Sequence, residues 1–191
     1  MQFEDGTFMR LYRQTVEDFG LYTGMELSDD ALEKLRTAAG EMSAKMRAVR
    51  IVSASSVSKK DLQQRLVQKG EDPRQAKAAV AWMEELSLID DRKTAEQIVA
   101  RCISKGYGPA RAKQALYEKR IPKAYWDDAL ADYPDQSDAI GKFLASRVST
   151  SSDKKEVHRA IDALIRKGHS YGAIRRVLEQ LSFNTDEFPE E

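Results

Sequence analysis

Apolar residues recur at helical spacing in three similar segments of this chain. An apolar residue is followed four positions later by leucine and three positions after that by lysine, at Leu62, Leu66 and Lys69, at Ala112, Leu116 and Lys119, and at Ala160, Leu164 and Lys167. The register continues into the next helix, in the sets Ala76, Trp126 and Ile174, Val80, Leu130 and Leu178, and Met83, Tyr133 and Leu181. The repeat is about 50 residues long, and a repeat of this length is one supersecondary unit that packs on its neighbours. The pattern therefore predicts an all-α fold, an elongated array of three tandem three-helix modules.

Breaks in the periodicity set the expected boundaries. They predict three-helix repeats at 41–89, 90–133 and 134–182, an acidic and partly irregular N-terminal segment with one helix at 1–40, and an acidic tail at 183–191. Apolar residues before residue 28 lack helical spacing, so that stretch is expected to be non-helical, with a short strand or two around residues 7–13. Ser28 is expected to cap a helix that ends near Ala39.

Residues at helix ends and in the core follow from the same pattern. Ser58 and Asp72 occupy positions where a side-chain oxygen caps a helix N-terminus. The single cysteine, Cys102, lies at helical spacing among apolar residues and is expected to be a buried thiol. The expected core leucines are Leu62, Leu66, Leu86, Leu116 and Leu164.

Charge is segregated although the 31 basic and 31 acidic residues balance overall. Residues 1–40 hold 4 basic and 8 acidic residues, whereas residues 41–182 hold 27 basic and 19 acidic ones. Net charges of +3, +3 and +2 fall on the expected middle helices of the repeats, 58–70, 108–120 and 152–168. Their sum equals the whole excess of basic over acidic residues in 41–182. This ladder of basic helices suits a polyanion or an acidic protein groove. Simple solvation of amphipathic helices is the alternative explanation.

The residues of the chain do not indicate an enzyme. Its two histidines, His158 and His169, have no cysteine or carboxylate at metal-ligand spacing, and a surface position is expected for both. Gly106 and Gly108 stand beside basic residues, but no Gly-Lys-Ser/Thr follows them, so an exposed helix stop is favoured over a phosphate loop. No cofactor and no metal are expected.

The sequence contains no run of about 18 apolar residues, so no membrane span is expected. It also lacks the charged, apolar and small-residue order of a secretory leader. A cytoplasmic protein is the simplest interpretation. A monomer is favoured, because the basic array would repel a second copy.

Residues 86–91 read Leu-Ser-Leu-Ile-Asp-Asp, residues 105–111 read Lys-Gly-Tyr-Gly-Pro-Ala-Arg, and residues 58–70 carry Ser-x-x-Asp-Leu-x-x-x-Leu-x-x-Lys-Gly. These three motifs resemble those of the regulatory protein RecX family. The resemblance covers roughly residues 45–182. Arg120 departs from the family pattern, which has glycine there, so a looser helix stop is expected at that position.

This resemblance implies a function. RecX proteins are all-α, are built of tandem three-helix modules and bind the recombinase RecA. They lodge along the groove of the RecA–single-stranded DNA filament and suppress its ATPase, strand-exchange and co-protease activities, within DNA repair, recombination and the SOS response. The exposed candidates for contact with the filament are Arg65, Lys69, Lys105, Tyr107, Arg111, Lys119, Arg120, Arg166 and Lys167.

Two other functions remain open from the residues alone. A stand-alone nucleic-acid-binding protein with helix-turn-helix-like modules would bind single- or double-stranded DNA with a steep salt dependence. A scaffold for another acidic protein would use the same basic helices. Only Tyr107, Tyr117 and Tyr171 lie among the basic residues as candidates for base stacking, so direct strand binding has weak support.

Overall fold

The protein is all-α in its computed structural model, which describes residues 1–4, 6–149 and 152–181. Ten α-helices and one 3₁₀ turn form within these residues, so the predicted fold class is confirmed. The β structure of this part of the chain is an isolated antiparallel bridge between Gln2 and Phe8. The predicted acidic tail at 183–191 and residues 150–151 lie outside the described residues. Contacts divide the chain into two units, Met1–Asp90 and Asp91–Glu191.

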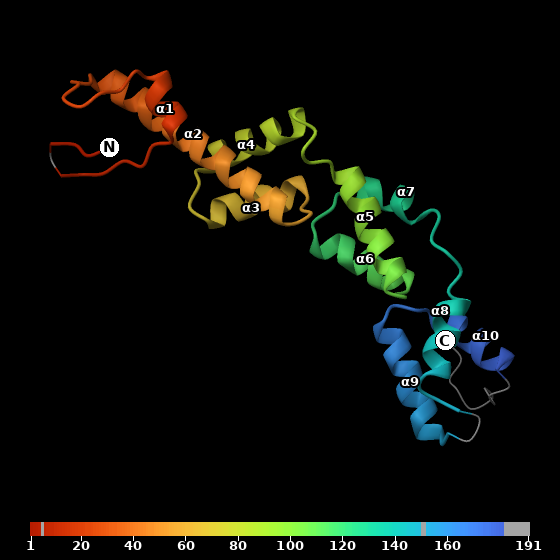
Figure 1. Cartoon of the computed structure of the whole chain (residues 1–191). Coiled ribbons are helices and arrows are strands. Elements are labelled where there is room, and N and C mark those ends of the chain that lie inside the picture. The colour runs from red at the N-terminus through yellow and green to blue at the C-terminus, as the bar shows by residue number, and fades with distance from the viewer. Residues whose placement is uncertain (5, 150–151, 182–191) are drawn as a thin grey trace. The chain divides into compact units, whose positions relative to one another are not determined.

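The first unit is organised around one long helix. It contains α1 (Arg13–Asp18), α2 (Asp29–Ala54), α3 (Lys59–Gln68) and α4 (Pro73–Glu85). Both α3 and α4 pack against the C-terminal part of α2 and against each other (Figure 1). Their shared core is built from Ala44, Ala48, Leu62, Leu66, Ala76, Val80 and Met83, together with flanking residues.

Side-chain caps start these helices as the sequence predicts. The Ser28 hydroxyl accepts a hydrogen bond from the Ala31 amide, and the Ser58 hydroxyl accepts one from the Asp61 amide at 3.1 Å. The Asp72 carboxylate accepts a hydrogen bond from the Arg74 amide at 2.8 Å, with proline in the first turn. Each cap pairs an amide at the helix start that has no partner within its own helix.

Three expectations for the N-terminal segment are wrong. Residues 13–18 form α1 although the apolar spacing there does not indicate a helix, and the strand expected at residues 7–13 is reduced to the Phe8 bridge. The helix that Ser28 caps does not end near Ala39 but continues for 26 residues to Ala54. Gly40 lies inside it, and a Cβ there would stand 2.2 Å from Nε2 of Gln75 on α4. This glycine admits a neighbouring side chain rather than ending the helix.

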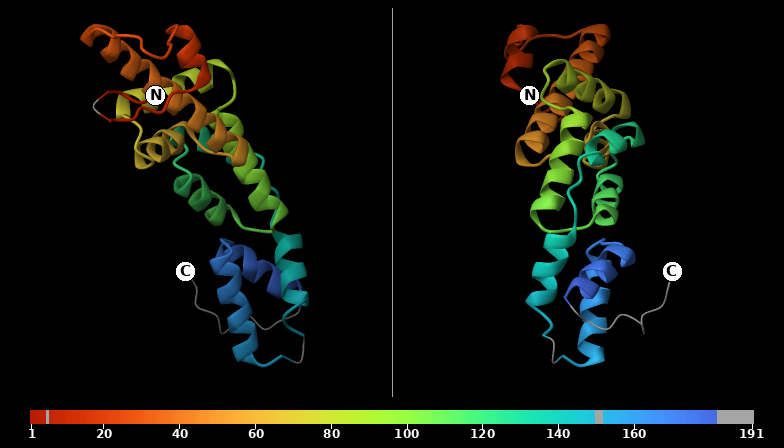
Figure 2. Two further views of the ribbon diagram at one scale, coloured as in Figure 1. Left: turned by 60° about the vertical axis from the view of Figure 1, so that its left-hand side comes forward. Right: turned by 90° about the vertical axis from the view of Figure 1, so that its right-hand side faces the viewer.

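The second unit contains two groups of helices, each with its own core. Its elements are α5 (Asp91–Ser104), α6 (Pro109–Glu118), η1 (Lys123–Tyr125), α7 (Trp126–Leu130), α8 (Ser137–Ala145), α9 (Lys154–Arg166) and α10 (Tyr171–Gln180). One core joins α5, α6 and α7 around Val99, Leu116 and Ile121. The other joins α8, α9 and α10, which lie together in both views of Figure 2, around Leu144, Leu164 and Ile174.

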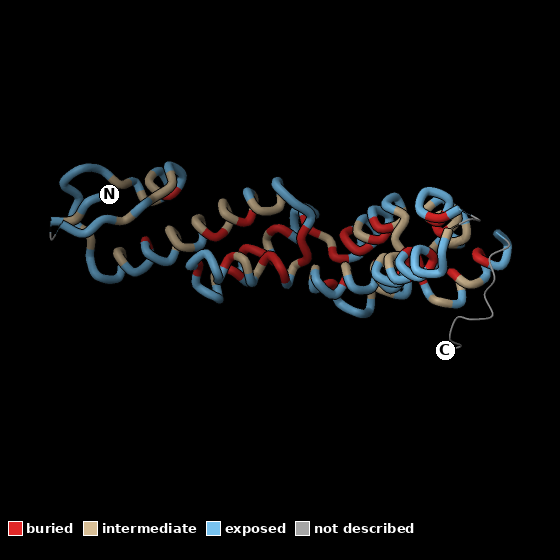
Figure 3. The backbone as a smooth tube through the Cα atoms, turned by 90° about the horizontal axis from the view of Figure 1, so that it is seen from below, coloured by how far each residue is buried: buried red, intermediate tan, exposed pale blue. Residues whose placement is uncertain are grey.

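Equivalent positions of the repeat are buried in the same way. Leu66, Leu116 and Leu164 have no exposed surface, and Figure 3 shows buried residues following the inner faces of the helices. Leu86 is an exception, because 49% of its surface is exposed although it was expected in the core. It follows the last residue of α4, where the chain turns away, and Ile89 is the apolar residue of this turn that is buried.

The middle helices α3, α6 and α9 end in the same left-handed turn. The residues that follow their C-caps, Gly70, Arg120 and Gly168, have φ angles of 91°, 55° and 88°. In each turn two backbone amides donate to carbonyls of the last helical turn, for example Gly70 to Val67 and Glu71 to Leu66. Arg120 and the residue after it make the equivalent two bonds at 2.9 and 3.0 Å, so the looser stop expected there is not found.

We predict that Arg120→Gly stabilises the protein, because a non-glycine residue with φ of 55° carries a steric cost that glycine avoids. The expected gain in the free energy of unfolding is about 0.5–1 kcal/mol, reduced from the full cost by the greater freedom of glycine in the unfolded chain. Urea denaturation would measure it. Arg120→Ala removes the same charge but keeps the left-handed strain. An equal gain in both variants would assign the effect to charge and contradict the backbone explanation.

Candidate partner-binding surface

Most of the nine candidate contact residues lie at the ends of the middle helices. Lys69, Lys119 and Lys167 are the C-cap residues of α3, α6 and α9. The carbonyls at a helix C-terminus carry a partial negative charge that a nearby cation stabilises. The repeated lysine therefore has a structural role in each helix, whatever else it contacts.

The turn between α5 and α6 binds the turn between α9 and α10 through the backbone. The Gly108 amide donates to the Lys167 carbonyl at 2.9 Å, and the Ala110 amide donates to the Gly168 carbonyl at 3.2 Å. Gly108 is the N-cap of α6 and provides no side-chain cap. The carbonyls of the second turn take the place of that cap. We call these two hydrogen-bonded turns, residues 105–111 and 166–170, the turn joint.

Glycine is required at two positions of the turn joint by close packing. A Cβ on Gly108 would lie 2.1 Å from the carbonyl oxygen of Gly168, and a Cβ on Gly168 would lie 2.3 Å from the amide nitrogen of Arg111. Both of these neighbours are backbone atoms and cannot rotate away. Gly106 and Gly108 therefore form a helix stop, as favoured from the sequence, but Gly108 is buried rather than exposed.

Aromatic rings of the second unit hold one of the candidate cations. The Lys167 ammonium lies 5.4 Å from the centroid of the Tyr107 ring and 5.2 Å from that of the Phe143 ring, within the range of a cation–π interaction. The Tyr133 hydroxyl donates to the Tyr107 carbonyl at 2.8 Å, and burial raises the pKa of Tyr133 to about 12. Tyr107 and Lys167, chosen from the sequence as exposed contacts, are thus half-buried and contact each other.

Arg111 also has a partner within the chain, in a partly exposed ion pair. Its Nη1 lies 3.0 Å from Oε1 of Glu118, and this hydrogen bond holds the pKa of the Glu118 carboxyl below its usual range. Arg111 and Lys105 also lie close enough to Cys102 to favour its thiolate, but burial outweighs them and raises the pKa of that thiol. Cys102 is a buried thiol, as predicted.

His169 is buried in the turn joint, so its expected surface position is wrong, whereas His158 is exposed as expected. The Nε2 atom of His169 lies 3.1 Å from the Gly106 carbonyl, so the neutral ring donates this proton, and Nδ1 is buried without a hydrogen-bond partner. Burial lowers the pKa of His169, the Gly106 bond opposes this shift, and Lys167 adds to it.

The remaining candidates differ in exposure. Lys105 and Arg166 are exposed at the ends of α5 and α9, and Arg120 is exposed after α6. In the first unit, Arg65 and Lys69 line a hollow between α2 and α3. Arg47 and Arg50 of α2 also line this hollow, but they were missed because the first-unit candidates were taken from the middle helix. The net charge of +2 over residues 41–57 is the signal that could have indicated them.

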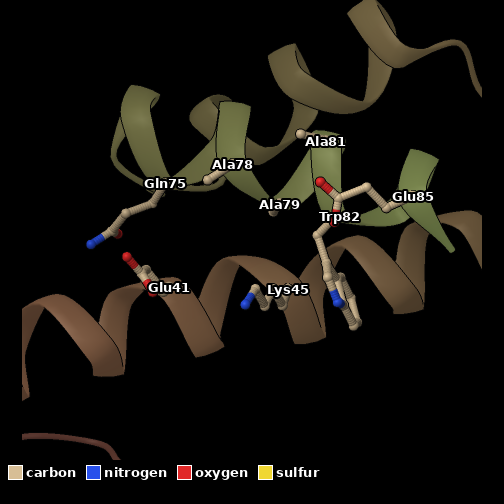
Figure 4. A pocket seen from close by; sticks show the side chains of 8 residues that line it. All are labelled: Glu41, Lys45, Gln75, Ala78, Ala79, Ala81, Trp82 and Glu85. Atoms are coloured by element: carbon tan, nitrogen blue, oxygen red, sulfur yellow. The ribbon is translucent and has the colours of Figure 1, made fainter.

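A second hollow of the first unit lies between α2 and α4 (Figure 4). Its lining includes Glu41, Lys45, Gln75, Trp82 and Glu85. The Lys45 ammonium lies 5.5 Å from the centroid of a Trp82 ring. The lining holds the carboxylates of Glu41 and Glu85 and one lysine, so the hollow has no excess of positive charge.

The described residues contain neither a metal-binding cluster nor a helix that could span a membrane. No cluster of three or more histidine, cysteine, aspartate or glutamate side chains there is arranged to hold a metal ion. None of the helices in this part of the chain combines the length and the apolar character needed to cross a membrane.

The fold and these turns define an all-α protein whose described helices, apart from α1, form three groups with separate cores. Residues 90–130 match the family model described as RecX, second three-helix domain. Regulatory protein RecX of Clostridioides difficile is 27% identical over 192 residues, which span 97% of this chain and 89% of that protein. Regulatory protein RecX of Cronobacter sakazakii is 30% identical over 129 residues, which span 59% of this chain and 78% of that protein. The chain belongs to the RecX family.

Solved structures support the fold. A crystal structure of regulatory protein RecX aligns with a TM-score of 0.70 at 20% identity, covering 93% of this chain and 92% of that one. The crystal structure of RecX from Lactobacillus salivarius aligns with a TM-score of 0.65 at 24% identity, covering 76% of this chain and 98% of that one. At these identities the likeness establishes the fold alone.

We predict that Gly168→Ala destabilises the turn joint, because its Cβ would collide with the backbone of Arg111 and the residue has φ of 88°. The free energy of unfolding should fall by more than about 1 kcal/mol, measured by urea denaturation. Gly172→Ala is the matched control, since a Cβ there meets nothing within 4 Å. Equal stability of Gly168→Ala and the control would contradict the close packing of the two turns.

We predict that His169 makes the protein less stable at acid pH. Its pKa is lowered from 6.5 on folding, so its contribution is complete above that unfolded value. The contribution is lost as pH falls through 6.5 towards the folded pKa, because the unfolded chain then binds more protons. In urea titrations between about pH 7 and 5, His169→Gln should lose less stability than the unmodified protein. His158→Gln should behave like the unmodified protein, and parallel pH profiles for all three would refute this assignment.

Proposed function

We propose that this protein inhibits the RecA recombinase by lodging in the groove of the RecA–single-stranded DNA filament. Bound there, it suppresses the ATPase, strand-exchange and co-protease activities of the filament. The observation that carries this proposal is membership of the RecX family, whose relatives bear the name regulatory protein. The mechanism is steric and electrostatic, with no bond made or broken and no cofactor.

We further propose that the three-helix repeats, residues 41–89, 90–133 and 134–182, act as successive contact modules. Linked modules bind a long partner more tightly than any one of them, because each later contact is intramolecular. Cations at equivalent helix ends, such as Lys69, Lys119 and Lys167, support this proposal. Successive subunits of a filament would then each meet a similar positive charge, one on each module.

Four candidate contacts of the second unit differ in whether the chain itself already engages them. Lys167 lies against the Tyr107 ring and Arg111 pairs with Glu118 of the same helix, so reversing either charge would remove a contact within the chain as well as any contact at an interface. Lys105 and Arg166 are exposed. The exposed pair therefore provides the cleaner test of contact with the filament.

We predict that the protein inhibits the single-stranded-DNA-dependent ATPase of the cognate RecA at well below one copy per recombinase, because one bound molecule blocks filament growth. The Lys105→Glu/Arg166→Glu variant should need at least about tenfold more protein for the same inhibition, as two opposite charges become repulsive. The assay is steady-state ATP hydrolysis against protein concentration.

Lys123→Glu/Lys142→Glu is the matched control, since it reverses two exposed lysines of the same unit that are not among the candidates. If both variants inhibit equally, the two candidates are not contacts. If the unmodified protein leaves the ATPase unchanged but binds naked DNA tightly with a steep salt dependence, the regulator proposal fails. The stand-alone nucleic-acid-binding function then replaces it.

A further inference from the structure

The hollow between α2 and α3 of the first unit gathers four cationic side chains. It has a volume of about 360 Å³. Arg47 and Arg50 reach it from α2, and Arg65 and Lys69 reach it from α3. The apolar part of its lining comes from Ile51 and Ala54. We call this hollow the α2–α3 groove.

Buried carboxylates hold two of the four cations in place. Nε of Arg47 lies 2.5 Å from Oε1 of Glu71, whose side chain is 7% exposed and also accepts a hydrogen bond from Ser43. Nη2 of Arg65 lies 2.9 Å from Oδ2 of Asp61, whose side chain is 6% exposed. A guanidinium group fixed by one carboxylate still has further N–H donors to offer to a ligand.

The other two cations keep their full charge. Arg50 and Lys69 are exposed and have no carboxylate partner among the described residues. With two of the four charges balanced by Glu71 and Asp61, the α2–α3 groove retains a net charge of +2. A ligand with at least two negative charges is the chemical complement of such a site.

The arrangement of the cations favours a nucleic-acid backbone over an acidic protein. Residues three or four apart on a helix lie about 5–6 Å apart at Cβ, and packed helices lie about 8–10 Å apart. The pairs on α2 and α3 therefore form two short rows, which suit the successive phosphates of a strand. A protein partner would instead be expected to bury an aromatic or arginine anchor in a pocket. The aliphatic residues Ile51 and Ala54 provide a surface for sugars rather than a deep pocket.

We propose that the α2–α3 groove binds the sugar–phosphate backbone of a single-stranded nucleic acid, without reading its bases. Arg50 and Lys69 neutralise phosphates, while Arg47 and Arg65, fixed by their carboxylates, donate hydrogen bonds to phosphate oxygens. No aromatic residue lines the groove, so base stacking makes no contribution. Arg65 and Lys69 are also among the nine candidate filament contacts, but binding to a free strand needs no recombinase, so this proposal can be tested separately from the proposed function.

The test compares the full chain with Arg50→Ala/Lys69→Ala in binding to a labelled oligothymidylate by fluorescence anisotropy at several salt concentrations. Each phosphate neutralised on a single strand contributes a slope of about −0.7 to log K against log salt. Loss of two contacts should make the slope shallower by about 1.4 and lower the affinity roughly tenfold at physiological salt. An abasic oligomer of equal length should bind the full chain as tightly as oligothymidylate does.

Arg74→Ala/Lys77→Ala is the matched control, because it removes two exposed charges from α4 of the same unit. Urea midpoints equal to that of the full chain would show that both variants are folded. If the two variants lose the same affinity and slope, or the full chain does not bind the oligomers, the proposal is overturned. It is also overturned if the groove variant binds oligothymidylate normally but loses inhibition of the RecA ATPase, since the groove would then bind an acidic protein. Strong preference for oligothymidylate over the abasic strand would exclude backbone recognition.

Discussion

The left-handed turn that closes each middle helix is the constraint on which the described fold depends. One residue with positive φ stops the helix, and the chain then reverses so that the third helix of the group can pack on the core. Glycine meets this requirement twice, at Gly70 and Gly168, and Arg120 meets it at a steric cost. The buried leucine one turn earlier in each helix, such as Leu116, accepts one of the two closing hydrogen bonds. Core and turn are therefore specified together.

The same turn after α9 also completes another helix. The first amides of α6 and the last carbonyls of α9 are groups that lack partners within their own helices, and the turn joint pairs them with each other through Gly108 and Gly168. The positive end of one helix dipole thereby meets the negative end of another. Close approach of two backbones excludes any Cβ at the contact, and this explains the Lys-Gly-x-Gly and Lys-Gly spacings better than a phosphate loop does.

Periodicity predicted the features that depend on local sequence. The helices of the three repeats, the caps at Ser58 and Asp72 and the buried Cys102 all follow from spacing and from residue type. The errors arise where a distant segment decides the outcome. Gly40 stays helical because it packs on α4, and His169 is buried because the turn of another helix group covers it. Nothing within a single helix encodes such contacts, so a lone glycine or histidine is misread.

The sequence predicted least well which basic residues are available to a partner, because residues of the same charge differ in what surrounds them in the fold. Lys167 lies against two rings and Arg111 pairs with a carboxylate, whereas Lys105 has neither. A cation fixed by the protein itself loses little conformational entropy when a partner binds, but part of its charge is already balanced. An exposed lysine loses more entropy and brings its whole charge, whose effect salt screens. A surface that combines both kinds gains orientation from the first and attraction from the second. The α2–α3 groove has this combination within one hollow, where Arg47 is fixed and Arg50 is exposed.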